Sequence, residues 1–117
     1  PSIDCAKASA KHLKKNFRFI AGKIDEMCVQ TRLPRPVPGE PEKILLDPPR
    51  KGCAPGVIHA LAMRKPVRVC HVFCGTDEIP ASLKEWERYG YRVREVQPLD
   101  LFPGTPHLET IVMLERK

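Results

Sequence analysis

Three short stretches of the sequence carry residue types that can do chemistry, and the first is Asp47-Pro48-Pro49-Arg50. Its carboxylate directly ends an apolar run at 43–47, and the two prolines after it have a fixed φ. If that run is a buried strand, Asp47 lies at the edge of the sheet where α/β proteins bind ligands. The tetrapeptide is equally compatible with a stiff turn in which Asp47 caps the residues that follow.

The second stretch is centred on Cys74, which comes one residue after the apolar run 67–73 and before Gly75-Thr76. A helix expected to begin shortly afterwards would lower the pKa of this thiol and favour the nucleophilic thiolate. Cysteines are more often small buried side chains, and for Cys70 this is the only interpretation. Cys74 is therefore the candidate nucleophile.

The third stretch, residues 100–109, reads Asp-Leu-Phe-Pro-Gly-Thr-Pro-His-Leu-Glu. In an extended chain, residues two apart point to the same side, so His107 and Glu109 would act together. A hairpin connection with a solvated glutamate is the alternative. We favour a positioning loop, because the segment is long for a simple connection and is stiffened by two prolines.

Alternating helices and strands are predicted around these stretches, which is the pattern of an α/β domain with a mostly parallel sheet. Continuous apolar runs predict buried strands, and apolar residues at helical spacing predict amphipathic helices. The four prolines within 31–42 predict an extended loop. Helices are predicted at 3–15, 24–30, 55–63 and 77–89, and strands at 17–21, 43–47, 67–73, 91–99 and 110–116.

The chain of 117 residues has room for one domain, and its 42% apolar and 29% charged residues are typical of an ordered domain. No apolar run approaches the ~20 residues that span a bilayer, and no segment has the pattern of a signal peptide. We therefore expect no membrane partner and a cytoplasmic location. The five scattered cysteines form no C-x-x-C, which argues against a disulfide framework or a zinc site.

The net charge of +6 is concentrated at the beginning of the chain. Residues 1–23 contain six lysines and arginines and one acid, Asp4. A basic face of this kind suits a polyanion such as RNA. An ordinary solvated helix face explains it equally well on charge alone.

Taken together, the three stretches resemble the RNA (uracil-5-)-methyltransferases, which are class I enzymes that use S-adenosyl-L-methionine. The resemblance rests on Leu-Leu-Asp-Pro-Pro-Arg-x-Gly at 45–52, on the strand that ends at Cys74, and on the stretch 100–109. It extends from Pro1 to Lys117, in order and at matching spacing. It implies a Rossmann-like fold with helices on both faces of the sheet and an antiparallel strand pair at its end.

The resemblance also implies a role for each candidate residue. Cys74 would add to C6 of a uridine in tRNA or rRNA, which makes C5 nucleophilic enough to accept the methyl group. Glu109 would then remove the C5 proton, and Asp47 would lie beside the cofactor. Arg50 and His107 are the candidates for contacts with the RNA, whose target base must leave its stack. No metal site is expected.

Several features depart from the family pattern, and two of them bear directly on the site. Gly75-Thr76 follows Cys74 where relatives commonly have Asn-Pro, and the glycine-containing cofactor loop is expected upstream of Pro1. The chain therefore resembles a single, truncated methyltransferase domain without its first strands. We expect residues 17–21 either to pair directly with 43–47 or to pack elsewhere. The alternative function is a non-catalytic, methyltransferase-like module that only docks RNA.

Overall fold

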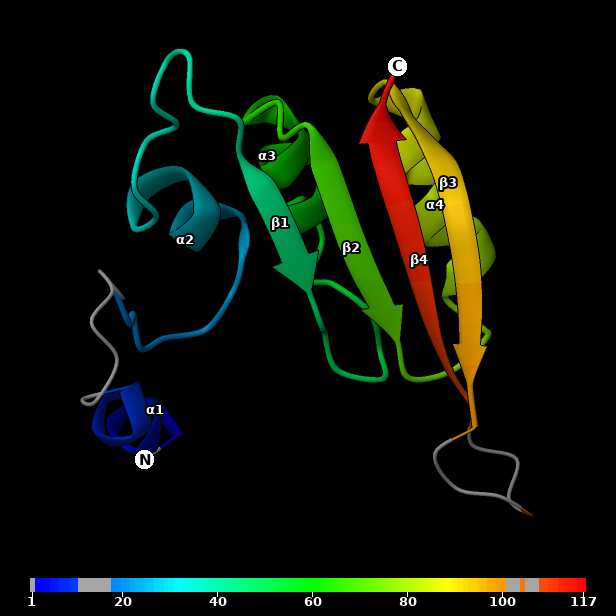
Figure 1. Ribbon diagram of the computed structural model, residues 1–117, viewed down its shortest axis with the longest axis horizontal. Helices are drawn as coiled ribbons and strands as arrows, with labels where there is room; N and C mark the ends of the chain where they lie inside the picture. Colours follow the sequence, from blue (N-terminus) through cyan, green and yellow to red (C-terminus); the bar gives the residue numbers. More distant parts are fainter. Residues whose placement is uncertain (1, 11–17, 101–103, 105–107) are drawn as a thin grey trace.

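The computed structural model describes residues 2–10, 18–100, 104 and 108–117 (Figure 1). The helices are α1 (Ser2–Ala10), α2 (Glu26–Thr31), α3 (Val57–Met63) and α4 (Ile79–Arg88), and the strands are β1 (Lys43–Leu46), β2 (Arg68–Phe73), β3 (Tyr91–Leu99) and β4 (Glu109–Arg116). The helix predicted at 3–15 is present as far as Ala10, and its remainder lies outside the described residues. None of the helices in these ranges is long and apolar enough to cross a membrane.

The four strands form one sheet in the order β1-β2-β4-β3. β1 pairs with β2 in parallel, and β4 pairs antiparallel with both β2 and β3. The α/β class and the antiparallel strands at the end of the sheet are thus confirmed. The parallel part is smaller than predicted, because it consists of a single strand pairing within the described residues.

The strand predicted at 17–21 is wrong for the part that the structure describes. Residues 18–21 belong to no helix or strand, and residue 17 lies outside the described residues. A strand needs a neighbour with which it forms a hydrogen-bonded ladder, and among the described residues β1 is paired only with β2. Direct pairing of this segment with β1, one of the two expected arrangements, therefore does not occur over residues 18–21.

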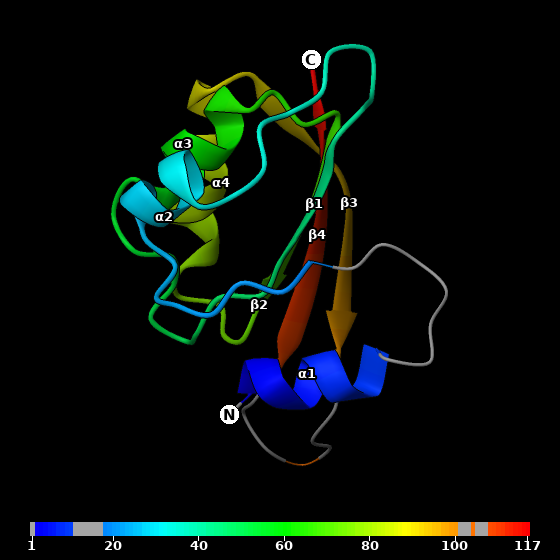
Figure 2. The same cartoon turned by 90° about the vertical axis from the view of Figure 1, so that its left-hand side faces the viewer.

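Three helices lie on one face of the sheet. Figure 2 shows α2, α3 and α4 on this face, whereas α1 lies beyond the end of the sheet toward which β1 and β2 point. The distribution of helices is therefore more one-sided than expected. Among the described residues, no helix covers the opposite face, which we call the open face.

The core lies between the sheet and helices α3 and α4. Alternate residues of β2 point into it, so Val69, His71 and Phe73 are buried. Trp86 of α4 packs against this row, and its Nε1–H donates a hydrogen bond to Nδ1 of His71 at 3.1 Å. Burial lowers the pKa of His71 to about 4, so this imidazole is neutral near pH 7.

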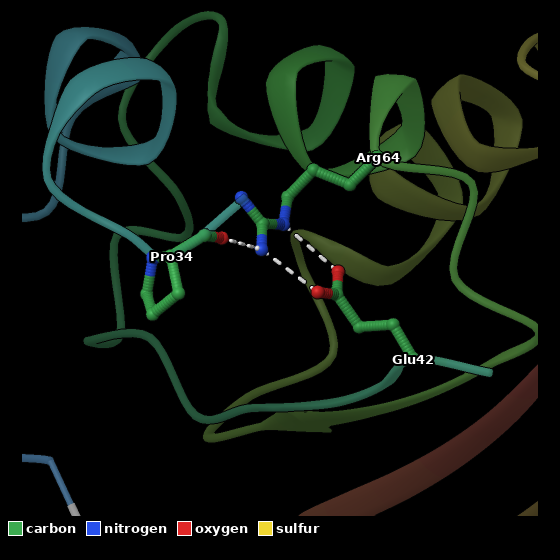
Figure 3. A network of polar contacts seen from close by, with 3 residues as sticks. All are labelled: Pro34, Glu42 and Arg64. Carbon is green, nitrogen blue, oxygen red and sulfur yellow. Dashed lines mark hydrogen bonds and ion pairs between the residues drawn. The ribbon is translucent and has the colours of Figure 1, made fainter. Parts of the chain in front are cut away.

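The proline-rich segment is an ordered loop held by one side chain (Figure 3). Its first residue is Arg32, because Thr31, predicted to be in the loop, is the last residue of α2. The guanidinium of Arg64 donates to both carboxylate oxygens of Glu42, at 2.8 and 2.7 Å, and also to the carbonyl oxygen of Pro34. Arg64 thus ties both ends of the loop to the end of α3.

Candidate functional site

The structure brings Cys74 and Glu109 together, although they are 35 residues apart in the sequence. Cys74 directly follows β2, and Glu109 is the first residue of β4. These strands are antiparallel, with Phe73 opposite Thr110, so the next residue pair of the ladder is Cys74 and Glu109. The Cys74 Sγ lies 3.9 Å from Glu109 Oε1, within reach of a weak hydrogen bond from the thiol. Both residues are half-buried.

Arg50 lies beside this pair. A Cβ atom placed on Gly75 would be 3.9 Å from Arg50 Nε, so the guanidinium passes over the residue that follows Cys74. The same two loops also approach each other at Gly52, whose Cα faces the Glu78 carboxylate. The segments after the two parallel strands therefore meet at the carboxyl ends of those strands, where α/β sheets bind ligands.

Asp47 is exposed and lines a separate cavity of about 610 Å³. The walls of this cavity are mainly apolar and include Ile24, Leu45, Pro48 and Val57. A pocket of this size with a carboxylate at its edge suits a ligand that combines an apolar ring with hydrogen-bond donors. Neither Cys74 nor Glu109 is among its described lining residues.

Two other cysteines have environments that favour the protonated thiol. Burial, together with the nearby carboxylates of Glu85 and Glu78, raises the pKa of Cys53 to about 11. Burial also raises the pKa of Cys70. Because both thiols stay protonated, neither Cys53 nor Cys70 is a candidate nucleophile. Within the described residues, no group of three or more His, Cys, Asp or Glu side chains could hold a metal ion.

Sequence reasoning overlooked some features of this region and misplaced another. The approach of Arg50 to Gly75 and of Glu78 to Gly52 joins distant segments, and no sequence pattern signals such contacts. Helix α4 begins at Ile79, two residues later than predicted, so it starts farther from Cys74 than expected. His107 lies outside the described residues.

Comparison with known proteins identifies the family. The family described as tRNA (uracil-5-)-methyltransferase matches residues 40–117. Over 98% of its length, the chain is 37% identical to an uncharacterised RNA methyltransferase of Clostridium acetobutylicum. The chain belongs to the tRNA (uracil-5-)-methyltransferase family.

A second relative in this family group is an uncharacterised RNA methyltransferase of Caldanaerobacter subterraneus subsp. tengcongensis, which is 34% identical over 97% of the chain. The chain spans about a quarter of the length of both relatives, 25% and 24% respectively. Motifs in the three stretches thus led to the correct family.

A solved structure of the same family supports the fold. It is the tRNA (uracil-54, C5)-methyltransferase of Pyrococcus abyssi in complex with S-adenosyl-L-homocysteine. This chain is 33% identical to it and superposes with a TM-score of 0.56. The match covers 62% of this chain and 18% of the Pyrococcus chain. The expected Rossmann-like methyltransferase fold is confirmed.

Proposed function

We propose that this chain carries the catalytic residues of an RNA methyltransferase that transfers a methyl group to C5 of a uridine in tRNA or rRNA. The observation that carries the proposal is the 3.9 Å approach of Cys74 Sγ to Glu109 Oε1. A nucleophile and a carboxylate base side by side are what substitution at C5 of uracil requires. Family membership supports the same reaction class.

The residues around Asp47 fit S-adenosyl-L-methionine as the cofactor. The cavity of about 610 Å³ offers apolar walls for an adenine ring, and Asp47 can accept hydrogen bonds from hydroxyl or ammonium groups. When bound, the cofactor supplies an electrophilic methyl group to C5 of the target base. Every other step of the reaction falls to residues of the protein and the RNA.

Cys74 acts first, as the nucleophile. Its thiolate forms a bond to C6 of uracil, and the electron pair of the C5=C6 bond becomes available at C5. Without this addition C5 is a poor nucleophile, so covalent catalysis divides one difficult substitution into easier steps. After methylation, C5 carries both a methyl group and a proton.

Glu109 completes the reaction as the base. Its carboxylate takes the proton from C5, the C5=C6 bond forms again, and the bond between C6 and Cys74 Sγ breaks. Cys74 leaves as a thiolate, ready for another cycle. The position of Glu109 beside the sulfur supports this role, because C5 and C6 are adjacent atoms of one ring.

Arg50 is proposed to bind the RNA. Its guanidinium presents several N–H donors beside Gly75, and such a group can pair with a base carbonyl or with a phosphate. His107 remains a predicted RNA contact, from its place two residues before Glu109.

A covalent trap tests the proposal. The full-length protein is incubated with S-adenosyl-L-methionine and RNA that contains 5-fluorouridine, and a denaturation-resistant protein–RNA adduct is sought. Fluorine at C5 cannot leave as a proton, so the enzyme should stall while attached to the RNA. Cys74→Ala should abolish the adduct and Cys70→Ala should retain it.

Two other outcomes of the covalent trap would contradict the proposal. An adduct that persists in Cys74→Ala would overturn the assignment of the nucleophile. RNA binding without any adduct would favour the alternative of a non-catalytic RNA-docking module.

A further inference from the structure

Five cations gather at the end of the sheet that is opposite to Cys74. Figure 1 shows that β1 and β2 begin at this end, where β4 finishes with the C-terminus of the chain. Backbone hydrogen bonds from Val67 to Glu42 and from Arg116 to Val67 join the three strand ends. We call these exposed residues the amino-end cluster: Lys43, Lys65, Arg68, Arg116 and Lys117.

The strand register places two of these cations next to each other. Lys43 of β1 lies opposite Arg68 of β2, and both side chains are exposed on the open face of the sheet. Like charges on neighbouring strands repel each other, which costs stability. A phosphate between the two side chains would convert this repulsion into attraction.

The two acids next to Lys43 and Arg68 are already engaged. Glu115, opposite Arg68, is paired with Arg92 at 2.9 Å, and Glu42 is paired with Arg64 at 2.7 Å. Within the described residues, neither Lys43 nor Arg68 takes part in an ion pair. Lys43 and Arg68 therefore form an uncompensated positive pair, of the kind that attracts a polyanion.

Arg68 of the cluster and Cys74 of the candidate active site lie on the same face of β2. Side chains alternate along a strand, so Arg68, Cys70, Val72 and Cys74 all point to the open face. Cys74 lies six positions after Arg68, which corresponds to roughly 20 Å along the strand. That length matches about six nucleotides along one strand of a duplex.

We propose that the amino-end cluster binds phosphates of the same RNA whose target uridine reaches Cys74, so that the RNA runs along the open face. This inference rests on the proposed function for its choice of polyanion. It adds a docking surface remote from the reacting base, and it predicts that duplex RNA shorter than about six base pairs gains nothing from the cluster.

The test compares salt dependence of RNA binding in two double variants of the full-length protein. Lys43→Gln/Arg68→Gln removes the adjacent cations of the cluster. Lys84→Gln/Arg88→Gln removes two exposed cations from α4, on the opposite side of the sheet, and is the matched control. The probe is a fluorescent RNA hairpin with a stem longer than six base pairs, titrated between low and moderate salt.

Losing two phosphate contacts should reduce the slope of log K against log salt concentration by about 1.5 in Lys43→Gln/Arg68→Gln. The control should keep the wild-type slope. An unchanged slope in Lys43→Gln/Arg68→Gln, or an equal decrease in the control, would overturn the proposal. Equal melting temperatures of the variants show that any loss is not due to unfolding.

A second readout separates this inference from the proposed function. A dinucleotide containing 5-fluorouridine can reach Cys74 but is too short to reach the cluster as well, so its adduct should form equally fast in wild type and in Lys43→Gln/Arg68→Gln. A slower reaction would contradict a purely remote role. If the wild type forms no adduct with this RNA or with the 5-fluorouridine RNA of the covalent trap, the proposed function fails. The salt slopes still decide whether the cluster binds phosphates.

Discussion

Trp86 Nε1 donates a hydrogen bond to His71 Nδ1 across 3.1 Å in the layer between β2 and α4. His71 is 1% exposed, and its Nε2 has no partner in the described part of the chain. The bond requires a neutral imidazole, because a protonated ring has no lone pair at Nδ1. The core is therefore built around an uncharged histidine.

This histidine should make folding stability sensitive to mild acid. Its pKa is lowered from 6.5 to about 4 by burial, so between these values the unfolded chain binds a proton that the folded protein does not. Its contribution is fully present above pH 6.5 and is lost as the pH falls toward 4. The free energy of unfolding, measured with urea, should therefore fall by on the order of 3 kcal/mol between pH 6.5 and pH 4.

Substitutions at two histidines identify the source of that pH dependence. His71→Phe should flatten the stability profile between pH 6.5 and 4, even though it lowers stability at pH 7 by leaving Trp86 Nε1 without its acceptor. His59→Asn, at a half-buried position on α3, should keep the wild-type profile. A profile that stays steep in His71→Phe would exclude His71 as the cause.

Glu109→Gln should trap the reaction on unmodified RNA. An amide cannot take the C5 proton, so Cys74 stays bonded to C6 after methylation. We expect a denaturation-resistant adduct with ordinary uridine and turnover lower by about 10²- to 10⁴-fold. Gel electrophoresis of labelled RNA measures both. Glu115→Gln, on the same strand and the same face, should turn over normally and form no lasting adduct.

Cys53 should resist alkylation near neutral pH. With a pKa of about 11 it is almost entirely protonated at pH 8, and only the thiolate is reactive. Mass spectrometry after iodoacetamide treatment should show labelling roughly a hundredfold or more slower than that of a cysteine with the ordinary pKa of about 8.5. Exposed Cys5 is the internal reference. Equal rates at the two positions would contradict the buried environment of Cys53.

Arg64 should stabilise the protein through geometry as well as charge. Arg64→Lys keeps the charge but cannot bind both oxygens of Glu42 and the Pro34 carbonyl at once. Arg64→Ala should cost about 2 kcal/mol in urea unfolding, and Arg64→Lys should recover only part of this. Both variants should be cut faster by protease within 32–42.

The exposed ion pair of Arg92 and Glu115 is the control for the Arg64 variants. Its arginine side chain is 62% exposed, so Arg92→Ala should cost less than about 1 kcal/mol. If Arg64→Ala and Arg92→Ala lowered the free energy of unfolding equally, the contacts of Arg64 with the proline-rich loop would not stabilise the protein more than an exposed ion pair does.

Most elements could be predicted from local sequence, because an apolar run or an amphipathic repeat has a definite period. β2 and β4 are within one residue of their predicted bounds. The strand predicted at 17–21 is wrong for residues 18–21, because a local pattern does not reveal pairing partners. A short apolar run is compatible with a strand, but only a neighbour with free hydrogen-bonding groups makes it one. No local pattern contains that information.

The sequence by itself determined which side chains are the candidates for the chemistry, since Asp47, Arg50, Cys74 and Glu109 occur in motifs with recognisable order and spacing. Only the tertiary structure decided which of them meet. The antiparallel register of β2 and β4 places Cys74 beside Glu109, whereas Asp47 lines its own cavity. Register depends on hydrogen bonds between strands distant in the chain, so it emerges only when the whole sheet is formed.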